Sequence, residues 1–112
     1  MKIAFTAKGQ DWDAQIDPRF GRTDYIVIYD EDDESVEVVD NTNIANVAHG
    51  AGPRTAQKFA DIKPDVLITG NGPGGNAARA LDKIDLEVYA GANGMTVGES
   101  YQAYKEGKLN KV

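Results

Sequence analysis

The stretch DVLITGNGPGGNAARALDKI, residues Asp65 to Ile84, joins an apolar run to an Ala-rich run through a glycine-rich turn. The apolar run, Asp65 to Thr69, predicts a strand covered on both faces, as in a parallel sheet. The Ala-rich run, Asn76 to Ile84, repeats its apolar residues at helical spacing and predicts a helix. This stretch therefore predicts one strand–turn–helix half of a right-handed βαβ crossover.

Patterns on either side supply the remaining elements. They predict strands at Lys2 to Ala7, Tyr25 to Tyr29, Val36 to Val39 and Leu86 to Ala90, and helices at Pro53 to Ile62 and Val97 to Glu106. The acidic run Asp30 to Glu34 is expected to form the solvated tip of a hairpin.

Two late βα units require parallel strands, whereas the early hairpin adds one antiparallel strand. We therefore expect a single α/β domain over residues 1–112. Its fold class is a ribonuclease H-like three-layer fold, with a mixed five-stranded sheet of order 3-2-1-4-5 and strand 2 antiparallel. A flavodoxin-like sheet would need a helix between the first two strands, and Gly9 to Arg22, interrupted by Pro18 and Gly21, does not supply one.

Composition excludes several kinds of site. The 112 residues contain no cysteine, so disulfides, thiolate nucleophiles and Cys-ligated zinc or iron–sulfur centres are ruled out. The net charge of −6 disfavours nucleic acid as a partner, because phosphate-backbone binding needs a basic surface. Without a signal-like N-terminus or a long apolar run, we expect a soluble, cytoplasmic protein with no membrane partner.

Four loops are expected to meet at one edge of the sheet, because the first, third, fourth and fifth strands run the same way. They are Lys8 to Arg22, Asp40 to Gly52, Gly70 to Gly75 and Gly91 to Thr96. Ligands of open α/β sheets bind outside the carboxyl ends of strands. The basic residues Lys8, Arg19, Arg22 and Arg54 belong to this edge, which favours an anion as the ligand.

The spacing G-x-G-x-x-G at Gly70, Gly72 and Gly75 does not predict a nucleotide site. A dinucleotide loop closes the first βαβ unit and is followed about 20 residues later by an acid. Here it follows the fourth strand, no carboxylate lies near Ala90 to Ala92, and no Lys-Ser or Lys-Thr forms a Walker loop. A glycine turn into a helix N-terminus remains, which either favours an anion or serves only as a turn.

Catalytic constellations are also missing. A two-metal nuclease needs carboxylates on the first and fourth strands, and the first strand, KIAFTA, has none. No Ser-His-Asp or Cys-His set can be assembled, and no pair of acid/base carboxylates is localised on the loop edge. His49, the only histidine, is the candidate metal ligand; the alternative is a surface or structural role.

Several motifs resemble those of the dinitrogenase iron-molybdenum cofactor biosynthesis family, whose members are nitrogenase accessory factor-like proteins. In chain order they are DPRFGR from Asp17, VDN from Val39, HGAG from His49, DVLITGNGPGGNA from Asp65, VYAG from Val88 and YKEGKL from Tyr104. Together they cover nearly the whole chain.

The resemblance implies a ribonuclease H-like fold and a non-catalytic role. Its members bind the nitrogenase cofactor, its precursor or another molybdenum-containing sulfide cluster, and carry it between proteins. The implied cargo here is an anionic iron–sulfur or copper–sulfur cluster with molybdenum, held non-covalently and delivered to a protein partner. The alternatives are a cargo-free interaction or regulatory module and a small-anion or nucleotide-binding enzyme.

The candidate site combines the loop-edge arginines with the positions that match the family's loops. It comprises Arg19, Arg22, His49, Gly50, Gly52, Arg54, Asn71, Gly72, Gly74 and Gly75. Some family members carry His at the position of Arg19, so this chain offers at most one imidazole. A bulky residue at Gly72 or Gly74 is expected to block binding, by crowding or by forbidding a positive φ.

Overall fold

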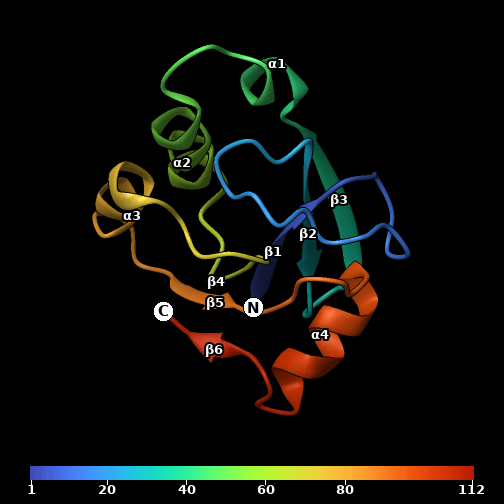
Figure 1. The fold of residues 1–112 in the computed structure, drawn as a ribbon. Coiled ribbons are helices and arrows are strands. Elements are labelled where there is room, and N and C mark those ends of the chain that lie inside the picture. The colour runs from blue at the N-terminus through green and yellow to red at the C-terminus, as the bar shows by residue number, and fades with distance from the viewer.

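The computed structural model describes residues 1–112 and contains one mixed sheet with helices on both faces (Figure 1). Its strands are β1 (Lys2–Ala7), β2 (Tyr25–Asp30), β3 (Ser35–Asp40), β4 (Val66–Ile68), β5 (Glu87–Ala90) and β6 (Asn110–Lys111). Its helices are α1 (Thr42–Ala45), α2 (Ala51–Ile62), α3 (Gly75–Leu81) and α4 (Val97–Lys105).

The sheet has six strands in the order β3-β2-β1-β4-β5-β6. The predicted order of the first five strands is confirmed, with β2 antiparallel to both neighbours and β4 parallel to β1 and β5. The predicted number of five strands is wrong, because β6 pairs antiparallel with β5 through Tyr89 and Ala90. A strand of two residues is too short to leave a period in the sequence, and it forms where the chain returns after α4.

Successive side chains of a strand point to opposite faces of the sheet, so the strands contribute to two separate cores. Ile3 and Phe5 of β1 belong to the core beneath α4, whereas Ala4 belongs to the core beneath α2 and α3. Figure 1 shows α2 and α3 together on one side of the sheet and α4 on the other. The carboxyl ends of β1, β3, β4 and β5 therefore share one edge, beside the starts of α2 and α3.

Element boundaries differ from the sequence prediction at a few places. The short helix α1 lies in a segment expected to be loop, and α2 begins at Ala51, which puts Pro53 inside its first turn. Helix α3 ends at Leu81 instead of Ile84. None of the helices is both long and apolar enough to cross a membrane.

Candidate functional site

A cleft of about 420 Å³ lies between the starts of α2 and α3 and the segment that follows β1. Three chain segments distant in sequence form its walls. The lining residues are Arg19, Gly21, Arg22, Gly50, Ala51, Gly52, Pro53, Gly74, Gly75, Asn76 and Ala77. The cleft therefore brings together Arg19, Arg22, Gly50, Gly52, Gly74 and Gly75 from the predicted site.

The first turns of α2 and α3 border the cleft, and neither helix has a side-chain N-cap. The N-cap of α2 is Gly50, with φ of 78°, and the N-cap of α3 is Gly74; neither position carries a capping hydrogen bond. Backbone N–H groups of the first turns consequently have no acceptor in the structure. They are those of Ala51, Gly52, Gly75, Asn76 and Ala77. Such groups, with the helix dipole, favour an anion.

The cleft floor is closed by backbone contact between Gly21 and Gly52. A Cβ on Gly21 would lie 2.8 Å from Cα of Gly52, and a Cβ on Gly52 would lie 3.2 Å from Cβ of Ala77. Side chains larger than hydrogen at Gly21 would push α2 away from the preceding loop. These glycines therefore set how closely the three walls approach one another.

A buried polar network holds that approach in place. The hydroxyl of Thr55, in α2, donates to the carbonyl of Gly21 at 2.7 Å and accepts from Nδ2 of Asn41 at 3.0 Å. Asn41 Nδ2 also donates to the carbonyl of Thr23, and all three side chains are fully buried. Both hydrogens of Asn41 Nδ2 are bonded, whereas Oδ1 of Asn41 is buried without a hydrogen-bond partner, so the network is satisfied on its donor side only.

Arg19 stands at the cleft in partnership with Asp17. Its Nε lies 3.1 Å from Oδ1 and its Nη2 3.2 Å from Oδ2 of the fully buried Asp17 carboxylate, while 54% of the Arg19 side chain is exposed. This hydrogen-bonded carboxylate raises the pKa of Arg19 above its usual value. Arg19 is thus a fixed cation whose charge is matched from beneath.

Arg22 is anchored to the loop between α1 and α2. Its Nη1 donates to the carbonyls of Ala45 and Val47 at 3.0 and 2.7 Å, and its Nη2 donates to that of Ala48 at 3.4 Å. These bonds satisfy the carbonyl of the last residue of α1 and two carbonyls of the loop that leads to His49. Arg22 therefore lines the cleft while its Nη1 and Nη2 groups are hydrogen-bonded to the protein.

The model of the dinitrogenase iron-molybdenum cofactor family matches residues 1–107 of the chain. The chain belongs to this family. The recognition made from DPRFGR, HGAG and the later motifs is thereby confirmed. A search of curated proteins gives no match.

Solved structures agree with membership of the dinitrogenase iron-molybdenum cofactor family. The apo form of the orange protein from Desulfovibrio gigas is 35% identical over 99% of this chain and 92% of its own, with a TM-score of 0.92. A Thermotoga protein described as NifB and as a DUF35 member is 34% identical over 98% and 91%, with a TM-score of 0.84. PH0822, at 23% identity over 100% and 96% and a TM-score of 0.74, shares the fold.

Four predicted site residues of this family member do not line the cleft: His49, Arg54, Asn71 and Gly72. His49 is exposed and directly precedes the N-cap of α2, so it lies beside the cleft along the chain. Arg54 is exposed on the first turn of α2. The side chain of Asn71 instead accepts a hydrogen bond from Asn93 at 2.9 Å.

The glycine expectation also needs correction. Neither Gly72 nor Gly74 has a positive φ, and a Cβ at Gly74 would meet nothing within 4 Å. Among the glycines of these loops, the tight positions are Gly21, described above, and Gly70. A Cβ on Gly70 would lie 2.6 Å from Cα of Pro18. The sequence prediction did not include Gly21, Asp17, Asn41 or Thr55 among the site residues, although Asp17 and Gly21 lie in the DPRFGR motif and Asn41 ends the VDN motif.

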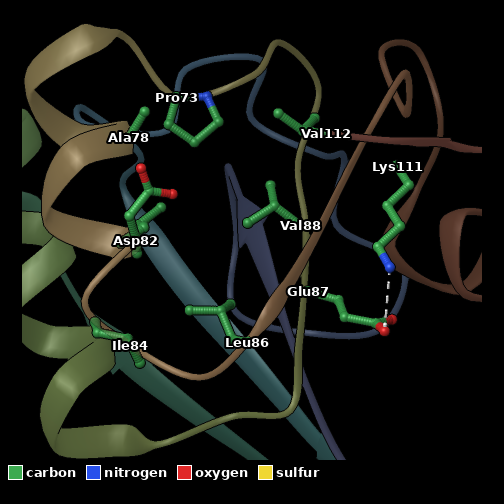
Figure 2. Close-up of a pocket in the computed structure, with 10 residues that line it drawn as sticks. Pro73, Ala78, Asp82, Ile84, Leu86, Glu87, Val88, Lys111 and Val112 are labelled. Atoms are coloured by element: carbon green, nitrogen blue, oxygen red, sulfur yellow. Dashed lines mark hydrogen bonds and ion pairs between the residues drawn. The ribbon is translucent and has the colours of Figure 1, made fainter.

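A second cavity, of about 340 Å³, lies between α3, β5 and the chain end (Figure 2). Figure 2 shows Leu86 and Val88 pointing toward α3, with the Glu87–Lys111 ion pair, at 3.4 Å, to one side. None of the predicted site residues lines it, and its walls combine apolar side chains with the carboxylates of Asp82 and Glu87, which disfavour an anion. The chemistry of anion binding therefore belongs to the cleft and not to this groove.

Proposed function

We propose that this protein binds an anionic metal–sulfur cluster in the cleft and carries it to a protein partner. The observation that supports this most directly is the convergence of two uncapped helix starts on one cavity that Arg19 and Arg22 also line. Family membership supports this class of ligand, because the family is that of the dinitrogenase iron-molybdenum cofactor.

The donor set suits a preassembled cluster better than a bare metal ion. No group of three or more His, Asp or Glu side chains is placed to hold an ion. A cluster arrives with sulfide already filling most metal positions, so hydrogen bonds and positive potential are enough to hold it. His49 can add one directional ligand from the neighbouring loop.

A carrier role agrees with the openness of the site. The cleft is built from backbone N–H groups and arginines, without covalent ligands such as cysteine. Such contacts let a cluster leave intact, which delivery requires. The similar orange protein has a solved apo form, so that protein folds without its bound group, as a carrier must after delivery. We assign no catalytic step to the chain.

We infer that the sheet is of the ribonuclease H-like type. The order β3-β2-β1-β4-β5 with an antiparallel β2 supports this assignment. Hydrolytic nuclease activity does not follow from it, since fold alone does not carry function and β1 contributes no carboxylate. The added β6 lies outside the strands that define the order.

Two glycine variants test whether the cleft is the binding site. Gly74 lines the cleft and is unstrained, so Gly74→Phe is expected to fill the cavity without unfolding the chain. Gly72→Phe is the matched control, because Gly72 lies in the same loop but outside the lining. Each protein would be reconstituted anaerobically with a molybdenum–iron–sulfur or molybdenum–copper–sulfur cluster, desalted and measured for metals and visible absorbance.

Wild type and Gly72→Phe are expected to retain the cluster, and Gly74→Phe is expected to lose it. Equal retention by all three proteins would remove the cleft from the proposal. Retention by none of them would favour the cargo-free interaction module.

A further inference from the structure

Asp17 has a fully buried carboxylate and does not line the cleft. Its backbone is fixed to β1: the N–H of Asp17 donates to the carbonyl of Thr6 at 2.9 Å, and the hydroxyl of Thr6 donates to the carbonyl of Asp17 at 2.8 Å. The carboxylate therefore occupies a position that the sheet determines, beneath the cleft wall.

Three of the four hydrogen bonds that this carboxylate accepts come from Arg19. Oδ1 accepts from the backbone N–H and from Nε of Arg19 at 3.0 and 3.1 Å, and Oδ2 accepts from Nη2 at 3.2 Å. The N–H of Asp24 adds a bond to Oδ2 at 3.3 Å. This two-pronged contact fixes the guanidinium plane, since a planar fork meets a carboxylate in one geometry.

The pairing also changes the charge that a ligand meets. One negative charge directly below Arg19 cancels its field at distances longer than the pair itself. Arg22, the other cleft arginine, uses Nη1 and Nη2 on the carbonyls of Ala45, Val47 and Ala48. The remaining donors are mainly the free N–H groups of the helix starts, which carry only partial charges.

We propose, resting on the proposed function, that Asp17 is a positioning residue that fixes Arg19 and cancels its charge, so that the cleft rejects small oxoanions and accepts large thio-anions. A strongly hydrated anion such as phosphate needs uncompensated, charge-assisted bonds to offset its lost hydration. A larger sulfide-rich anion spreads its charge and is more weakly hydrated, so fixed backbone N–H groups suffice. Asp17 thereby sets selectivity without touching the ligand.

The test compares inorganic phosphate with tetrathiomolybdate as probes, by calorimetry at low and at physiological ionic strength. Wild type is expected to bind tetrathiomolybdate at least about tenfold more tightly than phosphate. Asp17→Asn frees the charge of Arg19 and is expected to tighten phosphate binding about tenfold, with a steeper loss of affinity as salt rises. The double variant Asp17→Asn/Arg19→Gln restores the charge balance and is expected to return the salt dependence to that of wild type.

A merely structural Asp17 would leave the ratio of the two affinities unchanged in every folded variant. Phosphate binding equal in wild type and Asp17→Asn would overturn the inference while leaving cluster binding intact. Failure of every protein to bind tetrathiomolybdate would count against the proposed function instead, and a phosphate gain in Asp17→Asn would still support charge cancellation by Asp17.

Arg19→Gln keeps the test decisive if Asp17→Asn does not fold. This variant leaves the buried Asp17 carboxylate without a compensating positive charge. Its negative charge should lower the affinity for phosphate about tenfold and the affinity for tetrathiomolybdate by a smaller factor. Equal losses for the two probes would contradict a role in selectivity. Thermal unfolding of each variant confirms that the comparison is made on folded protein.

Discussion

Gly21 and Gly52 meet backbone to backbone: a Cβ built on Gly21 would lie 2.8 Å from Cα and 2.9 Å from the nitrogen of Gly52. The first belongs to the loop after β1 and the second to the first turn of α2. Their contact lets the N–H groups of α2, the N–H groups of α3 and the two cleft arginines face one cavity. The absence of side chains at these positions thus builds the site as much as the charged groups do.

Gly21→Ala is expected to destabilise the fold by about 2 kcal/mol, because the new methyl group overpacks a backbone contact that cannot yield cheaply. Urea unfolding measures the change in free energy. Gly72→Ala is the control, since its Cβ would meet only Cγ2 of Val112 at 3.9 Å, and it should change stability by less than about 0.5 kcal/mol. Similar values for the two variants would contradict the tight contact.

Thr55→Val is expected to cost about 1 to 2 kcal/mol although the two side chains have nearly the same shape. The substitution leaves one hydrogen of the buried Asn41 Nδ2 and the partly buried carbonyl of Gly21 without these partners. Chemical denaturation measures the loss, and chemical shifts of Gly21 and Gly52 report whether the cleft floor opens. Unchanged stability would mean that water replaces the hydroxyl.

Local pattern accounts for the strands and the long helices. The run KIAFTA predicts β1 with its observed bounds, because period and β-branched content coincide there. Helix α1 was missed because four residues give no helical period and Asn41 makes no side-chain cap. Strand β6 was missed because its pairing depends on the position of β5, which no local pattern contains.

The sequence predicted only those site residues whose location depends on the course of the backbone. Gly50, Gly52, Gly74 and Gly75 follow from the rule that helices begin at the carboxyl edge of the sheet. The partnership of Arg19 with Asp17, and the attachment of Arg22 to the loop carbonyls, depend on tertiary placement. Counting arginines in the sequence therefore overestimated the positive charge available to a ligand.

The contact between the β2–β3 hairpin and α4 is expected to weaken in acid. Glu31 accepts hydrogen bonds from Tyr101 at 2.5 Å and from Lys105 at 2.9 Å, and these bonds lower the pKa of Glu31 from its usual value. A carboxylate whose pKa is lower in the folded state stabilises the fold above its unfolded pKa, and this stabilisation is lost as pH falls through the folded pKa. The affected window therefore lies below about pH 4.5.

Glu31→Gln tests this dependence. It should cost about 1 kcal/mol at pH 7, a modest value because the carboxylate is partly exposed, and progressively less as pH falls through the folded-state pKa of Glu31. Glu37→Gln, an exposed change on β3 at a carboxylate without an ion pair, is the control. Thermal unfolding across this pH range measures both, and a pH-independent difference between wild type and Glu31→Gln would contradict the role of the charge.

Neither ATP nor NAD is expected to bind with a dissociation constant tighter than about 10 μM, which corresponds to roughly −7 kcal/mol. The first glycine of the G-x-G-x-x-G spacing, Gly70, is packed against Pro18 and Asn93, and the N–H of Asn71 already donates to the carbonyl of Pro18. This loop therefore cannot wrap a pyrophosphate without local unfolding. Calorimetric titration provides the measurement, and a tighter constant for either nucleotide would show that the loop opens.

Cluster binding should weaken as ionic strength rises, and His49→Ala should weaken it further. Exposed charges such as Arg54 are screened beyond a Debye length of about 8 Å at physiological salt, whereas a bond from imidazole to metal is not. His49 is exposed, so its removal should leave thermal stability nearly unchanged while altering the visible absorbance of the bound cluster.

Lys83→Ala, which removes an exposed cation beyond the end of α3, is the control for loss of a surface side chain. Retention and spectra would be measured after reconstitution and desalting at two salt concentrations. Identical spectra and equal retention for wild type and His49→Ala would show that the cleft holds its cargo by N–H groups and charge alone.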